Sequence, residues 1–260
     1  MIGFLLRKTF YDLWDNLFKV VVLNLGFFAC TAILFIPAFI PEVFGSDTLV
    51  TLFSVLGVFV CSIYLAAASR AIKPVSDYGT FTFGDFFKAF KSAWPAGIVI
   101  GLSILFLFLI ITIIIPFYFT MENPIVGLAL SAVIFWVTLF AVISFQFYFT
   151  VIVRLSPNLI KAIKKCFLIS LDNTGMSFFL ILNNIVALAL SVFFAFMFPG
   201  PVGILLYLDE ALRLRLLKYD WLEANPDADR KKIPWDAILI DERERTGTRT
   251  LRNFIFPWKD

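Results

Sequence analysis

The sequence predicts an all-α membrane protein, a polytopic bundle of about six transmembrane helices in three hairpins, with amphipathic in-plane helices on the cytoplasmic side. The chain of 260 residues is 60% hydrophobic and 16% charged, whereas a soluble domain is about half apolar and about a quarter charged. Four apolar stretches reach the roughly 17–25 residues that a helix needs to cross the hydrocarbon: residues 23–40, 48–68, 97–119 and 124–153. A soluble fold would have to bury all four in one small core, so the pattern favours a membrane protein.

The basic residues predict the topology of these helices. Lys and Arg gather in four segments: residues 7–19, 70–91, 154–165 and 213–259. The turns at 41–47 and 120–124, which lie between them, contain none. Because short basic loops remain in the cytoplasm, we place both termini inside and expect two hairpins that reach the outer side.

The third hairpin is less regular. Residues 178–198 lead outward and Pro-Gly-Pro at 199–201 marks a turn, but the returning apolar run has only seven residues before Asp209 and Glu210. Two acids deep in hydrocarbon would cost about 2.5–3.5 kcal/mol each. A chain of five crossings, however, would place the basic tail outside, against the positive-inside rule. We therefore expect a sixth helix that is short or partly broken, with this acid pair near the inner interface.

A weak internal repeat runs through the chain. FFKAFKSAW in residues 86–94 aligns with LIKAIKKCF in residues 159–167, and both place apolar residues on one helical face and lysines on the other. The opening stretch FYDLWDNLFK has the same pattern. We predict three units within a transmembrane bundle of residues 1–218, followed by a cytoplasmic tail. The units are residues 1–72, 82–153 and 157–218, and the tail is residues 219–260. Amphipathic helices align easily with one another, so the pattern leaves common ancestry open.

The opening stretch, residues 10–19, also contains acids that could belong to a site. Asp12, Asp15 and Asn16 alternate with apolar residues, among them Trp14. The apolar positions recur at helical spacing, and each acid lies four residues from a lysine. We therefore expect the polar side chains to form the solvated face of an interfacial helix whose aromatic residues face the membrane. A protein contact at Asp12, Trp14, Asp15 and Asn16 is the alternative, and we assign no catalytic residue.

Polar and small residues at membrane depth have two interpretations. Asn24, Gln146, Asn183 and Asn184 are placed either to hydrogen-bond between helices or to line a polar path for a small neutral solute. The GIVIG motif at 97–101 predicts close helix packing within the bundle. The first five predicted crossings contain no charged residue at their centres, which argues against an ion-coupled pump.

The remaining residues give little sign of chemistry. The chain has no histidine and three scattered cysteines, so we expect neither a metal site nor a cofactor. The tail mixes eight basic with nine acidic residues, a balance that does not suit nucleic acid. A short helix is expected between Pro234 and Gly247. Beyond it, Phe254, Phe256 and Trp258 are expected to dock on the inner face of the bundle or on a partner.

Several motifs together resemble the YesL family of bacterial integral membrane proteins, over roughly residues 8–218. They are Trp-Asp-Asn at 14–16, Asn24 inside the first crossing, and the FxxFxK-type helix within RAIKPVSDYGTFTFGDFFKAFKSAW. The family is largely uncharacterised; the resemblance implies the bacterial inner membrane and an accessory role linked to carbohydrate uptake. Two features depart from it. Residues 219–260 extend the usual ending, and LFIPAFIPEVF keeps the proline of a family motif without its Thr and Gly.

Two hypotheses about function follow. The first is a non-enzymatic accessory or assembly protein that lies in the lipid bilayer and binds a membrane partner, such as a carbohydrate importer. The alternative is a channel or facilitator for a small neutral solute. A polar path past Asn24, Gln146 and Asn183 would favour the channel, and a bundle plugged by phenylalanine would favour the accessory protein.

Overall fold

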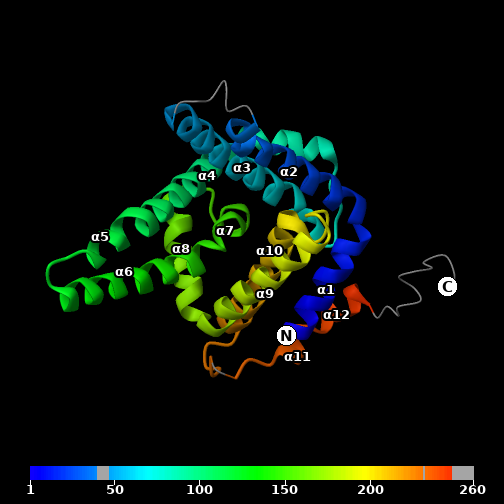
Figure 1. Ribbon diagram of the computed structural model, residues 1–260. Helices are drawn as coiled ribbons and strands as arrows, with labels where there is room; N and C mark the ends of the chain where they lie inside the picture. Colours follow the sequence, from blue (N-terminus) through cyan, green and yellow to red (C-terminus); the bar gives the residue numbers. More distant parts are fainter. Residues whose placement is uncertain (40–46, 231, 248–260) are drawn as a thin grey trace.

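The structure is a computed structural model that describes residues 1–39, 47–230 and 232–247 (Figure 1). Within these residues every regular element is a helix. In chain order they are α1 (Ile2–Asp15), α2 (Leu17–Phe39), α3 (Asp47–Ser76), α4 (Phe83–Leu109), the π-helix η1 (Ile110–Ile114), α5 (Ile115–Phe119), α6 (Pro124–Phe145), α7 (Tyr148–Arg154), α8 (Leu159–Asp172), α9 (Thr174–Phe193), α10 (Gly200–Ala224), α11 (Trp235–Ile238) and α12 (Ile240–Thr246).

Five helical segments in the described part of the chain are long and apolar enough to cross a membrane. They are Leu17–Ile36, Thr48–Ser76, Phe83–Phe119, Pro124–Arg154 and Thr174–Phe193. In their most apolar windows only 11–22% of the residues are buried inside the protein, so most of the apolar surface points outward, as it does in a membrane span. The chain is therefore an all-α, multi-pass membrane protein, as its composition predicts.

Three hairpins make up the bundle, and they differ in how closely they pack. The first, α2 with α3, packs closely against α4. In the second, α4 continues through η1 into α5 and returns as α6, and Figure 1 shows α5 and α6 projecting as an arm away from the other helices. The third is α9 with α10. The three predicted units correspond in order to α1–α3, α4–α7 and α8–α10; their common origin stays a prediction.

Glycines hold α4 against α3. A Cβ atom at Gly97 would lie 2.4 Å from the Cα of Ile63, and one at Gly101 would lie 2.6 Å from the ring of Phe59. Only glycine allows backbones to approach so closely. The expected packing role of the GIVIG motif within the bundle is thus confirmed.

The three amphipathic stretches are not built alike. The first and third form the separate helices α1 and α8, which are joined to their spans at Asn16 and Asn173. The second forms no helix of its own, because it is the start of α4, which continues through Pro95. A capping box between Thr82 and Asp85 fixes where that helix begins.

The last hairpin differs most from expectation. α10 is one continuous helix of 25 residues, so the expected short or broken helix is wrong. α10 is not among the five apolar segments, and a sixth crossing therefore stays a prediction. Its first turn lies beside Asn24, and α2 continues to Phe39, about 22 Å further along its own axis. Phe196 of the connecting turn stacks on Phe28, so this turn lies beside the middle of α2.

The described part of the tail folds back on the bundle. The short helix expected between Pro234 and Gly247 is present as α11 and α12, and Gly247 ends it with φ 66°. Leu239, between these two helices, is completely buried. The ring of Trp235 lies 5.4 Å from the guanidinium of Arg215 in α10. The tail thus docks on the bundle through residue 247.

Candidate functional site

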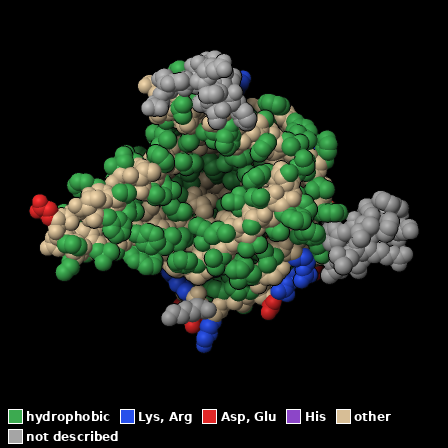
Figure 2. Space-filling model, in the orientation of Figure 1, with side chains coloured by type: hydrophobic (Ala, Val, Ile, Leu, Met, Phe, Trp, Pro, Cys, Tyr) green, Lys and Arg blue, Asp and Glu red, His purple; other side chains and the backbone are tan. Residues whose placement is uncertain are grey.

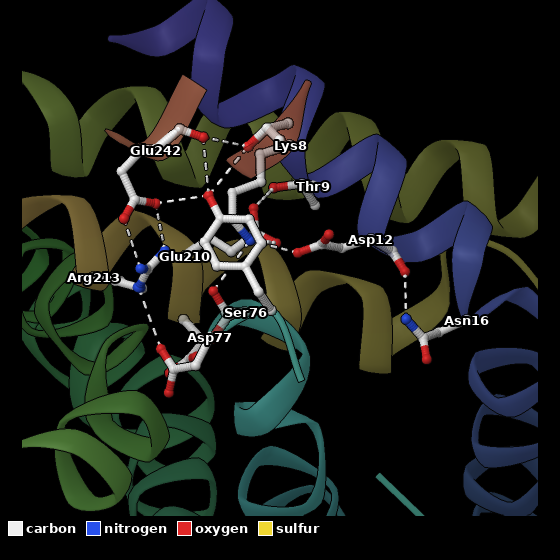
Figure 3. Close-up of polar contacts among 12 residues, drawn as sticks. Lys8, Thr9, Asp12, Asn16, Ser76, Asp77, Glu210, Arg213 and Glu242 are labelled. Atoms are coloured by element: carbon white, nitrogen blue, oxygen red, sulfur yellow. Dashed lines mark hydrogen bonds and ion pairs between the residues drawn. The ribbon is translucent and has the colours of Figure 1, made fainter. Parts of the chain in front are cut away.

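A cluster of charged side chains lies where α1, α7, α10, α12 and the end of α3 meet (Figure 3). We call this region the polar end of the bundle. Ionisable groups that are buried next to membrane spans are costly and mark candidate functional sites. Three cations, Lys8, Arg154 and Arg213, organise the cluster.

Lys8 joins α1 to α3 and α10. Its side chain is 2% exposed, and its ammonium donates to the carboxylate of Asp12 at 2.5 Å and to the backbone carbonyl of Ser76 at 3.1 Å. A second carboxylate oxygen, on Glu210, lies 3.5 Å away. Thr9 also donates to Glu210, at 2.5 Å. Burial alone would lower the pKa of Lys8, but the attraction of Glu210 and Asp12 outweighs it and raises the pKa above its ordinary value.

Arg154, the last residue of α7, joins the second hairpin to the third. Its Nε and one Nη donate to the two carboxylate oxygens of Asp209 at 2.7 and 2.6 Å, and the side chain of Asp209 is 1% exposed. The same guanidinium donates to Asp77 at 3.0 and 3.1 Å. Ser76 contacts both Arg154 and Asp209 through its hydroxyl. The pair is bidentate, which is the strongest geometry open to arginine and a carboxylate.

Arg213 holds the tail against the bundle. Its two Nη atoms donate to Glu242 of α12 at 2.6 and 2.7 Å, and its Nε lies 3.2 Å from Asp77. The hydroxyl of Tyr78 donates to the same Glu242 at 2.8 Å. Tyr78 adopts a left-handed backbone conformation, with φ 63°. Its ring lies beneath the ammonium of Lys8, at 4.4 Å from ring centroid to Nζ, and so connects the two halves of the cluster.

The charges of this cluster do not balance. Five carboxylates, on Asp12, Asp77, Asp209, Glu210 and Glu242, face three cations, on Lys8, Arg154 and Arg213. Each carboxylate nevertheless has a cation or a hydroxyl as partner, as Figure 3 shows for most of them. Within the described residues, no three His, Cys, Asp or Glu side chains are placed to hold a metal ion. The geometry is that of a joint between helices.

The structure corrects the interpretation of the opening helix. Asp15 is exposed, as expected of a solvated face. Lys8 and Asp12, however, belong to the buried face, with side chains only 2% and 16% exposed, so the prediction of a solvated face is wrong for them. Trp14 is 40% exposed on the side away from α10. Asn16 ends the helix and donates to the carbonyl of Asp12 at 3.0 Å.

Asn24 holds the turn before α10 in place. Its Nδ2 donates to the carbonyls of Met197 and Pro199 at 3.0 and 2.8 Å, and its Oδ1 accepts from the N–H of Val202 at 3.0 Å. Non-helical backbone at membrane depth is tolerated only where the protein satisfies its polar groups. A Cβ at Gly200, where φ is 64°, would lie 2.2 Å from the Asn24 amide. Both polar atoms of this amide are therefore hydrogen-bonded within the protein.

Gln146 lies in a separate group of amides. It donates to the carbonyls of Ile143 and Ser177 at 2.7 and 3.0 Å and accepts from Asn184 at 3.3 Å. The bonds with Ser177 and Asn184 join α6 to α9, as interhelical hydrogen bonds do in other membrane bundles. Asn183 is half-buried on the same helix as Asn184. The structure thus brings Gln146 and Asn184 together and places Asn24 in a different contact.

A second, smaller polar joint ties α8 to the end of α10. The carboxylate of Asp172 accepts from Lys218 at 3.1 Å and from the hydroxyl of Tyr219 at 2.9 Å. Asn173 accepts from Lys218 at 3.1 Å. Partial burial would raise the pKa of Asp172, but the hydrogen bonds from Tyr219 and Lys218 outweigh it and lower the pKa below its ordinary value.

Several of these residues were missed by reasoning from sequence. Ser76 ends α3, Asp77 and Tyr78 lie in the short turn after it, and their residue types give no sign of a site. Arg154 has the pattern of one more inner-side cation. The signal that could have found them was the acid pair Asp209–Glu210, because buried acids next to a span need partners. Phe254, Phe256 and Trp258 lie outside the described residues.

Comparisons with known proteins add no relative. A scan against protein-family models finds no match, and neither the curated proteins nor the solved structures contain a significant one. The YesL resemblance therefore stays a prediction from the motifs of the chain.

Proposed function

We propose that this protein is a non-enzymatic accessory or assembly protein that binds the transmembrane helix of a membrane partner in the groove between α4 and α6. The observation that carries the proposal is an apolar groove of about 440 Å³ between these helices. Its walls are Ile100, Ser103, Ile104, Phe106, Leu107, Ile110, Val137, Thr138, Ala141, Val142 and Phe145. All of them belong to membrane spans, so the groove opens at membrane depth.

The arm beyond the groove supports this proposal. Ile113, Phe117, Leu128 and Trp136 are each more than 60% exposed, although they lie on both helices of one hairpin. Figure 2 shows hydrophobic side chains over the arm and around the hollow of this face, while charged side chains gather at the lower edge. The π-helix η1, which begins at Ile110 on the groove wall, interrupts the regular helix at this point. Such π segments occur frequently at functional sites.

The proposal includes the location and topology of the chain. Both termini are proposed to lie in the cytoplasm of a bacterium, because the basic segments cluster at the polar end and short basic loops stay inside. The YesL resemblance supports the bacterial inner membrane and, for the partner, a carbohydrate importer. The channel hypothesis gains no such support, since the amide of Asn24 is bound to the backbone of the turn before α10 and the amide of Gln146 to the backbone of α9.

Affinity purification in mild detergent tests the proposal. The wild-type chain should retain an integral membrane protein in a fixed stoichiometry, and Ala141→Trp, which fills the groove, should lose it. Ala132→Trp is the matched control, because Ala132 is exposed on the same helix outside the groove. Recovery of a bare monomer from the wild type, or equal retention by both variants, would contradict the proposal.

A further inference from the structure

A second cavity lies at the polar end, between the start of α1 and the end of α12. It has a volume of about 360 Å³ and is lined by Met1, Gly3, Phe4, Arg7, Arg243, Thr246 and Gly247. Figure 1 shows the N-terminus beside α11 and α12. The cavity is separate from the groove proposed for the partner. It adjoins the charged cluster through Thr246, whose hydroxyl lies 3.1 Å from that of Tyr78.

Two guanidinium groups line this cavity. No carboxylate in the described ranges forms an ion pair with Arg7, whose side chain is exposed. Arg243 pairs with Asp236 at 2.7 Å, but the two side chains are 48% and 92% exposed. An ion pair so open to water is weak, and a better anion replaces it readily. The hydroxyl of Thr246 donates to the backbone carbonyl of Glu242 at 2.7 Å. The groups that the cavity offers to an anion are therefore its two arginines, which suit a phosphate.

An apolar stripe leads from the cavity to the membrane. Ile2, Leu6, Phe10 and Trp14 follow one another at every fourth position of α1, and each is 40–43% exposed. The rings of Phe10 and Trp14 stack at 6.1 Å. Because α1 joins the span Leu17–Ile36 at Asn16, the stripe runs from the cavity to the edge of the hydrocarbon. Aromatic side chains are typical of this boundary.

We propose that this region binds one anionic phospholipid, with its phosphate between Arg7 and Arg243 and its acyl chains along the stripe from Leu6 to Trp14. The two arginines explain the preference for an anionic head group. The stripe explains why the ligand is a lipid, since a free phosphate would leave these apolar side chains uncovered. The site holds a lipid in the leaflet on the side of the polar end and is independent of the proposed partner.

Native mass spectrometry of the purified full-length protein in detergent tests this site, with phosphatidylglycerol and phosphatidylcholine as probes. The wild type should bind one phosphatidylglycerol at least tenfold more tightly than phosphatidylcholine. The double variant Arg7→Gln/Arg243→Gln should weaken phosphatidylglycerol by about thirtyfold, from the loss of two basic groups at a membrane surface. A large excess of inorganic phosphate should leave the lipid bound.

Two further variants test whether the cavity itself, and not the positive charge of the whole protein, binds the lipid. A side chain added at Gly3 meets no atom within 4 Å, so Gly3→Leu should fill the cavity and weaken lipid binding without a change in charge. Lys88→Gln/Lys91→Gln removes two exposed lysines elsewhere and should bind like the wild type. The proposal is overturned if either cavity variant binds like the wild type, if the lysine variant weakens binding equally, or if inorganic phosphate displaces the lipid.

Discussion

Replacement of Arg154 by methionine should destabilise the bundle more than any other loss of one charge. The guanidinium makes two hydrogen bonds to Asp209 and two to Asp77. Asp77 keeps Arg213 as a partner, but Asp209, 1% exposed, would keep only the hydroxyl of Ser76. Removal of one partner from a buried ion pair costs about 3–5 kcal/mol. That is a large fraction of the 5–15 kcal/mol by which proteins are typically stable.

The free energy of unfolding measures this effect. The purified protein is titrated with sodium dodecyl sulfate in mixed micelles and followed by far-ultraviolet circular dichroism. Asp209→Asn removes the charge that Arg154→Met leaves behind, so the double variant should be no less stable than Arg154→Met alone. Lys88→Met is the control, because Lys88 is exposed, and it should change stability by less than about 0.5 kcal/mol.

Either of two results would contradict the prediction that Arg154 and Asp209 form a buried ion pair. If Arg154→Met costs less than about 1 kcal/mol, the ion pair of Arg154 and Asp209 contributes no more than a solvent-exposed pair does. If the losses from Arg154→Met and Asp209→Asn simply add, the two side chains do not act as one unit. Either result would make the cluster a set of surface charges.

Three further predictions concern other contacts. Asn24→Leu leaves two carbonyls and one N–H of the turn before α10 without a partner and should cost about 2–4 kcal/mol, measured in the same titration. Gly97→Leu pushes a side chain against the backbone of α3 and should cost about 2–3 kcal/mol. The pKa of Asp172 is lowered in the folded state by Tyr219 and Lys218, in spite of its partial burial. Its contribution is therefore present above pH 3.8 and lost as the pH falls further, so Asp172→Asn should flatten the acid limb of stability against pH.

Each of these variants has a control of the same chemistry. Asn183→Leu removes a half-buried amide from α9, outside the turn, and should cost less than Asn24→Leu. Gly84→Leu changes a glycine whose added Cβ would meet only the hydroxyl of Thr82, at 3.5 Å. Glu122→Gln replaces an exposed acid between α5 and α6 and is the control for Asp172→Asn. A control that matches its test variant would contradict the corresponding contact.

The spans and their closest packing could be predicted from the sequence because both depend on local composition. A run of about 20 apolar residues has few alternatives to a membrane helix, and glycines four residues apart make one flat strip on a helix, such as Gly97 with Gly101. The sequence also indicated Asn24, Gln146 and Asn184, which hydrogen-bond at membrane depth. Which groups they bind depends on residues far away in the chain, and for that reason their partners could not be predicted.

The faces of α1 could not be assigned for the same physical reason. Periodicity shows that a helix has a polar and an apolar face but not what either face touches. A lysine and an acid four residues apart, such as Lys8 and Asp12, look like a solvated pair. They are buried here because Glu210, about 200 residues later in the chain, packs against α1 and accepts hydrogen bonds from Lys8 and its neighbour Thr9. Because the face of α1 with Lys8 and Thr9 packs against α10, the stripe with Phe10 and Trp14 is left exposed.

The polar end joins all three predicted units, and this has a consequence for function. Lys8 comes from α1 in the first unit, Arg154 from the end of α7 directly after the second, and Asp209 with Glu210 from α10 in the third, so buried charge ties the units together at one end. At the other end, α5 and α6 extend beyond the remaining helices and contact few of them (Figure 1). The ion pairs of the polar end involve neither α4 nor α6, so a change in the spacing between these two helices would break none of them. A partner helix that enters this groove would therefore displace lipid from the arm, while the charged joint keeps the three hairpins in register.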